Sequence, residues 1–166
     1  MSGVCFSRSA KHMLAVAGTE RSTSTDGAMR LQPIRLGLES PVFVVFTSID
    51  RTLRALEKAS QLAKALGSEI EILAVQTVPF TLPLDNPSVP FEFLVRRLKG
   101  MVAQFPMHIR ISAYVCRDRL EALKCVLNHP CPVVIGIRKR WWPTRDERVA
   151  RKLRRAGYNV ILVETG

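Results

Sequence analysis

Apolar runs alternate with amphipathic segments from residue 41 onward, and this alternation restricts the chain to a small set of folds. The runs at 42–46 and 133–137 are continuously apolar, which indicates strands that are buried on both faces. Apolar-rich runs at 70–75 and 160–163 predict two further strands. Residues 107–115 alternate apolar and polar side chains, the two-residue period of a half-exposed edge strand. The sequence therefore predicts five strands.

Segments of helical periodicity separate these strands. Residues 50–66 and 91–105 carry apolar side chains at helical spacing, and Gly67 stands where the first of these helices should end. A short helix marked by leucines precedes the fourth strand. Thr144 and Glu147 form a capping-box signature, which predicts the start of the last helix.

This order of elements predicts the topology of the sheet. Strands joined by helices must cross over, and right-handed crossovers give a parallel sheet with helices on both faces. The most hydrophobic strands, 42–46 and 133–137, belong at the centre and 107–115 at an edge, which gives the order 3-2-1-4-5. The predicted fold class is α/β, a Rossmann-like five-stranded parallel sheet. Ligands of such sheets bind at the carboxyl ends of the strands where the strand order reverses, so we expect a cleft formed by residues 47–50 and 136–142.

The first forty residues differ from the rest of the chain. Residues 1–40 are rich in serine and threonine and show no sustained periodicity. They are predicted to form a disordered tail before a single domain of residues 41–166. The apolar run 13–17 is shorter than the core of a signal peptide, which needs about 7–15 apolar residues. A start of translation at Met29 is the alternative to a tail.

Composition and residue spacing exclude several classes of protein. No window approaches the roughly 18 apolar residues that a membrane-spanning helix needs. The four cysteines form no C-x-x-C pair, so a reducing, cytoplasmic location is expected. His12, His108 and His129 lie far apart in the sequence, and we find neither a Walker loop nor a nucleophile–base set. We therefore expect a protein without enzymatic activity and without a metal site.

Two adjoining segments carry a resemblance to a known family. Residues 55–67, ALEKASQLAKALG, and residues 69–75, EIEILAV, resemble the first helix and second strand of the universal stress protein family. The proline-bearing loop at 76–90 and the strand order match as well, so the resemblance covers about residues 41–164. It implies a non-enzymatic, nucleotide-binding regulatory module of the stress response. It also implies a homodimer, for which we expect the exposed edge of the last strand to be used.

The chain departs from this family where its ATP-binding members hold phosphate. Those members place an aspartate at the end of the first strand and a G-x-x-G pattern, followed by G-[ST], after the fourth. Here Thr47 occupies the aspartate position and Asp50 lies three residues later, while Val75 matches an expected apolar contact. Gly136 matches the first glycine, but Lys139 replaces the second. Because such glycines let backbone N–H groups wrap phosphates, we expect no cofactor held in the manner of ATP.

Cations and indoles occupy the place of the missing glycines. Residues 138–142 read RKRWW, in which the cations could hold an anion and an indole could stack on a base. The alternative is that both tryptophans cover the core beneath a shortened loop while the charges are solvated. The expected site for a nucleotide or other anion comprises Thr47, Ser48, Asp50, Val75, Gly136, Arg138, Lys139, Arg140 and Trp141.

Positive charge is concentrated in and just before the last helix. Nine basic and two acidic residues fall between 138 and 155, and the whole chain has a net charge of +11. Basic residues at i, i+3, i+4 and i+7 form a stripe that suits a polyanion, so nucleic-acid (RNA) binding through 145–155 is the alternative function. An acidic protein, an anionic membrane surface or plain solvation would also account for the stripe. The residues of this alternative site are Arg145, Arg148, Arg151, Lys152 and Arg155.

Overall fold

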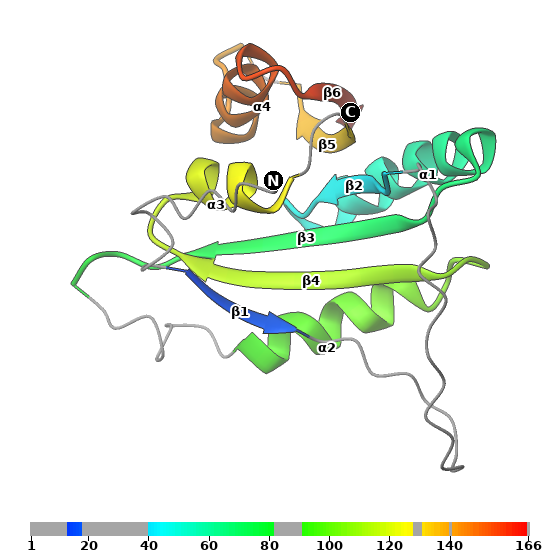
Figure 1. Ribbon diagram of the computed structural model, residues 1–166, viewed down its shortest axis with the longest axis horizontal. Coiled ribbons are helices and arrows are strands. Elements are labelled where there is room, and N and C mark those ends of the chain that lie inside the picture. Colours follow the sequence, from blue (N-terminus) through cyan, green and yellow to red (C-terminus); the bar gives the residue numbers. More distant parts are fainter. Residues whose placement is uncertain (1–12, 18–39, 82–90, 128–130, 140, 166) are drawn as a thin grey trace, which may run out of the picture.

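The computed structural model describes residues 13–17, 40–81, 91–127, 131–139 and 141–165. Four helices and six strands are described, and Figure 1 shows their arrangement. In chain order the elements are β1 (Met13–Ala17), β2 (Val42–Val45), α1 (Ile49–Leu66), β3 (Ile70–Thr77), α2 (Phe91–Val102), β4 (Ile109–Cys116), α3 (Arg119–Val126), β5 (Pro132–Arg138), α4 (Arg145–Arg155) and β6 (Asn159–Thr165).

The sheet has the strand order β1-β4-β3-β2-β5-β6. Strands β2 to β6 run parallel to one another, so the predicted five-stranded parallel sheet of order 3-2-1-4-5 is confirmed. All four residues of β2 are buried, and β5 is buried over most of its length, as expected for central strands. Strand β4 shows the alternating burial that its sequence predicted.

The strand β1 departs from the sequence prediction. Residues 13–17, which were expected in a disordered tail, pair antiparallel with β4 from Met13 opposite Cys116 to Ala17 opposite Ser112. The outer side of β4, predicted to be a free sheet edge, is therefore covered by β1 (Figure 1). The rest of the expected tail, 1–12 and 18–39, lies outside the described residues.

Helices cover both faces of the sheet, as the sequence predicted. Apolar side chains of α1 and α2 form one core with one face of the sheet, and those of α3 and α4 form a second core with the other face. In α1 the buried positions recur at helical spacing and include Ala55, Leu56, Ala59 and Ala63. None of the described helices is long and apolar enough to cross a bilayer.

Local signals fix the ends of the helices that matter for the site. Gly67 adopts the left-handed conformation with φ 65° and its N–H donates to the carbonyl of Ala63, so it ends α1 as predicted. The Thr144 hydroxyl accepts a hydrogen bond of 3.3 Å from the N–H of Glu147, so the predicted N-cap of α4 is confirmed. Because α1 follows β2 and α4 follows β5 in the chain, both helices start at the carboxyl ends of these strands.

Candidate functional site

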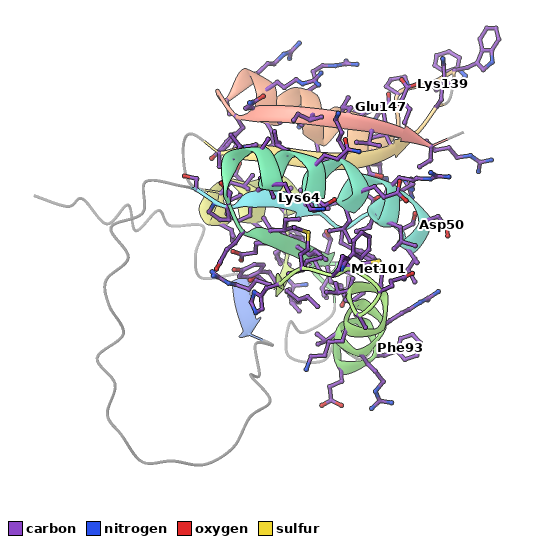
Figure 2. The ribbon with its side chains drawn as sticks, turned by 90° about the vertical axis from the view of Figure 1, so that its right-hand side faces the viewer. Asp50, Lys64, Phe93, Met101, Lys139 and Glu147 are labelled. Atoms are coloured by element: carbon purple, nitrogen blue, oxygen red, sulfur yellow. The ribbon has the colours of Figure 1, made fainter. Side chains whose placement is uncertain are left out.

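A cavity of about 600 Å³ lies at the carboxyl ends of β2 and β3, beside the first turn of α1 and against α2. Its volume falls in the range of pockets that bind small molecules. In Figure 2, Asp50 and Phe93, which line the cavity, lie toward the same end of the sheet as Lys139. The lining residues are Phe46, Thr47, Ser48, Ile49, Asp50, Val75, Gln76, Phe93, Leu94, Arg97 and Arg119.

The cavity combines an apolar wall with polar groups of both signs. Val75 from β3 and Leu94 from α2 are half-buried, and the Phe93 side chain is 57% exposed. An exposed aromatic ring beside aliphatic side chains is suited to cover a planar ring. Arg97 from α2 and Arg119 from α3 supply the positive charge. The first turn of α1 also lines the cavity, and a helix N-terminus favours negative charge.

The predicted residues Thr47 and Ser48 lie at the cavity but are engaged in hydrogen bonds within the protein. The Thr47 hydroxyl donates to the carbonyl of Gly136 at 3.1 Å, which joins the ends of β2 and β5. The Ser48 hydroxyl accepts from Nε of Arg51 at 2.8 Å and does not cap α1, although Ser48 is its N-cap residue. Both hydroxyls therefore shape the wall of the cavity.

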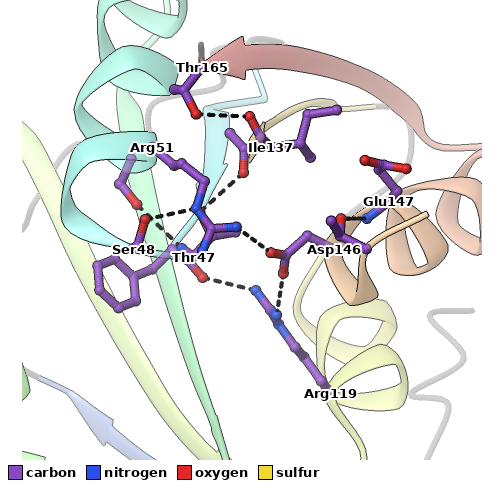
Figure 3. Close-up of polar contacts among 12 residues, drawn as sticks. Thr47, Ser48, Arg51, Arg119, Ile137, Asp146, Glu147 and Thr165 are labelled. Carbon is purple, nitrogen blue, oxygen red and sulfur yellow. Dashed lines mark hydrogen bonds and ion pairs between the residues drawn. The ribbon is translucent and has the colours of Figure 1, made fainter. Parts of the chain in front are cut away.

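An ion network occupies the other side of β2, toward β5. One guanidinium nitrogen of Arg51 lies 2.9 Å from one carboxylate oxygen of Asp146, and Arg119 lies 2.7 Å from the other oxygen (Figure 3). Arg119 also donates to the carbonyl of Phe46 at 2.9 Å. The three side chains are 12–26% exposed, so the two contacts stabilise more than pairs on an open surface do. This network, which we call the Arg–Asp–Arg clamp, ties the starts of α1, α3 and α4 together.

The glycine in the expected phosphate-binding position has a packing role. A Cβ atom at Gly136 would overlap the backbone carbonyl of Arg51, so β5 approaches the first turn of α1 too closely for any side chain. Gly136 itself is buried and does not line the cavity. The close packing of β5 against α1 is therefore sufficient to explain the glycine at position 136, and no bound phosphate is needed to account for it.

The tryptophans of the segment after β5 do not take the predicted covering arrangement. The Trp141 side chain is 102% exposed and that of Trp142 is 83% exposed, so the expectation that both cover the core is wrong. Neither these tryptophans nor Arg138 and Lys139 line the cavity beside residues 47–50. Lys139 approaches Glu164 at 3.9 Å on the surface.

The structure thus divides the predicted anion site. Four of its residues, Thr47, Ser48, Asp50 and Val75, come together around the cavity. The others lie elsewhere, namely Gly136 in the core and Arg138, Lys139 and Trp141 on the surface, while Arg140 lies outside the described residues.

Among the lining residues that the sequence analysis missed, three bear on ligand binding. Phe93 and Arg97 stand four positions apart on α2, the helix that follows β3, and Arg119 opens the helix that follows β4. Since the chain leaves parallel strands at their carboxyl ends, the first residues of the following helices lie at that end of the sheet. Arg119 could therefore have been predicted at the cavity from its place at the start of the helix that follows β4.

None of the three described cysteines, Cys116, Cys125 and Cys131, lines the cavity. Cys116 and Cys131 are buried, and burial raises the pKa of both thiols, which keeps them protonated. Among the described residues we find no group of histidine, cysteine and acidic side chains that could hold a metal ion.

A scan against protein-family models finds no match for the chain, and a search of curated proteins finds none either. A function must therefore be inferred from the geometry of the cavity and from the charges around it.

Proposed function

We propose that the chain is a cytoplasmic, non-enzymatic binding module that holds a nucleotide, or another small ligand with a planar ring and an anionic group, in the cavity at β2 and β3. The observation that carries the proposal is the pairing of an apolar, ring-covering wall at Val75 and Phe93 with two guanidinium groups in one cavity. The resemblance to the universal stress protein family agrees with this function. It also supports a homodimer through the outer edge of β6, which pairs with β5 and with no other described strand.

The two arginines of the cavity differ in the number of contacts that they make within the protein. Arg119 is held by Asp146 and Phe46, but its buried Nε has no hydrogen-bond partner among the described residues. Buried donors are nearly always paired, so an acceptor on a bound ligand would satisfy this group. Arg97 is exposed and forms no ion pair with any described residue. Arg97 is therefore placed to take the ligand's negative charge without breaking a contact.

Neighbouring arginines on α2 provide a matched test. Arg97 lines the cavity, whereas Arg96 is exposed on the same helix and does not. We expect AMP, ADP or ATP at ten times its Kd to stabilise the protein by about 1.4 kcal/mol, which raises Tm by about 3–6 °C in a domain of this size. Arg97→Ala should abolish this rise and Arg96→Ala should keep it, as measured by thermal denaturation with each nucleotide.

Two results of this experiment would contradict the proposal. One is the absence of any Tm shift in the unsubstituted protein with millimolar nucleotide or inorganic phosphate. The other is a shift that Arg97→Ala keeps and that Arg138→Ala with Lys139→Ala removes, since that would place the ligand on the surface segment after β5. Mass spectrometry of small molecules that co-purify with the native protein would then identify the ligand class.

A further inference from the structure

Two tryptophans and five cations are exposed in α4 and in the segment just before it. All seven side chains are exposed, and the tryptophans stand directly before the helix, separated from its N-cap by Pro143. We call this surface the Trp–Arg face. Its members are Trp141, Trp142, Arg145, Arg148, Arg151, Lys152 and Arg155.

The exposure of both indoles distinguishes this face from an ordinary solvated helix. Tryptophan is highly buried on average, and each indole offers a large apolar surface. Here neither Trp141 nor Trp142 contributes to the two described cores. Exposed aromatic side chains next to a charged rim are a feature of binding surfaces. Exposed cations are stable in water without a partner. Two exposed indoles instead indicate a partner that has planar or apolar groups of its own.

The inner face of α4 fixes the direction of its cations. Ala150 and Leu153 are fully buried against the sheet, so the charged positions between them must face outward. Arg154 bends back to the carbonyl of Val160 with two hydrogen bonds of 2.8 and 3.0 Å and is not part of the face. The remaining cations stay exposed along the helix.

The Arg–Asp–Arg clamp makes the face more positive than its sequence indicates. Of the two acidic residues in α4, Asp146 is turned inward and is held by Arg51 and Arg119. Two acidic side chains remain beside the cations: Glu147, which Figure 2 shows close to Lys139, and Glu164 of β6, which lines one pocket with Glu147 and Arg151. The five cations of the face still outnumber them. The partner of this face should therefore be strongly negative.

The length of the cation row favours a linear polyanion over a membrane. The indoles follow the carboxyl end of β5, whereas Arg154 reaches Val160 near the start of β6, so α4 runs back along the sheet away from them. Its 11 residues span about 16 Å. A bilayer surface needs its aromatic and cationic anchors at one depth. A nucleic-acid strand instead needs cations along its backbone and aromatic rings for its bases.

We propose that the Trp–Arg face binds single-stranded nucleic acid, with bases stacked on Trp141 and Trp142 and the phosphates following the cations of α4. This surface is separate from the cavity at β2 and β3, so the two proposals can be refuted independently of each other. The stripe predicted from the sequence is thereby joined to the indoles as one binding surface.

The test is a titration of the full chain with a fluorescently labelled single-stranded RNA of about 15 nucleotides, close to the upper site size of small single-strand-binding domains. We expect an association constant whose logarithm falls steeply and linearly with the logarithm of salt concentration. Trp141→Ala with Trp142→Ala should weaken binding about tenfold or more with little change in that slope. Arg148→Glu with Arg151→Glu should weaken binding and lower the slope by about 0.7 for each phosphate that is no longer neutralised.

The controls separate this face from net charge and from membranes. Lys58→Glu with Lys64→Glu changes the charge equally at two exposed positions of α1 and should keep RNA binding. Retained secondary structure in each variant, measured by circular dichroism, excludes unfolding as the cause of a weaker titration. The proposal is overturned by no RNA binding at low salt, by binding that the tryptophan variant keeps in full, or by equal weakening in the α1 control. Binding to vesicles of phosphatidylserine and phosphatidylcholine without binding to RNA would likewise overturn it.

Discussion

Two gaps between neighbouring strands open at the same end of this sheet, and they are built differently. Beyond β2 and β3 the side chains leave a cavity of about 600 Å³. Beyond β2 and β5, where the strand order reverses, the Arg–Asp–Arg clamp occupies the space. Strand order therefore indicates the end of the sheet at which a ligand binds, while individual side chains decide which gap stays open.

The largest expected effect comes from forcing the two elements of the closed gap apart. Gly136→Ala places a methyl group against the carbonyl of Arg51, and we expect the free energy of unfolding to fall by about 3 kcal/mol or more. Gly100→Ala is the matched control, since a Cβ there meets nothing within 4 Å and alanine favours the helix by up to about 1 kcal/mol. Urea denaturation of both variants measures the difference. Equal stability of the two would mean that β5 and α1 are not in close contact.

Removing the carboxylate of the Arg–Asp–Arg clamp should have the next largest effect on stability. Asp146→Ala leaves two partly buried guanidinium groups without their carboxylate, and we expect the free energy of unfolding to fall by about 2 kcal/mol. Glu147→Ala, in the same turn of α4, should cost only about 0.5 kcal/mol through the helix dipole. Chemical denaturation again provides the measurement. Reductions of similar size in both variants would assign the effect to the helix start and not to the clamp.

The smallest expected effect concerns the start of α4. Thr144→Ala removes the hydroxyl that accepts from the N–H of Glu147, which should lower the free energy of unfolding by about 1 kcal/mol. Thr144→Ser keeps an acceptor at the N-cap and should retain most of the stability. Thermal denaturation of the pair checks this, and a serine variant as unstable as the alanine variant would argue against the cap.

The fold could be predicted from the sequence because its signals are local. Continuous burial of β2 and β5 leaves continuous apolar runs, and alternating burial of β4 leaves alternating residues. The strand β1 could not be predicted in this way. Its five residues form a strand by pairing with β4, a contact between segments far apart in the chain that no local pattern encodes.

The candidate site could be predicted only where it follows the strands directly. Thr47 and Val75 are placed by the ends of β2 and β3, so their position at the cavity follows from the strand order. The exposure of Trp141 was not predictable, because an indole that covers the core and one that lies on the surface leave the same local sequence. Arg119 was missed although its place at the start of α3, directly after β4, puts it at this end of the sheet.

The short β1 strand bears on the behaviour of the protein at high concentration. Without it, the eight residues of β4 would offer a long row of free backbone donors and acceptors to other chains. With β1 in place, the outermost ladder on that side is only five residues long, and short outer strands are a common defence against fibre growth. In the homodimer proposed above, strand addition would take place on the β6 side, where one further copy satisfies the ladder of both molecules and growth would stop at two.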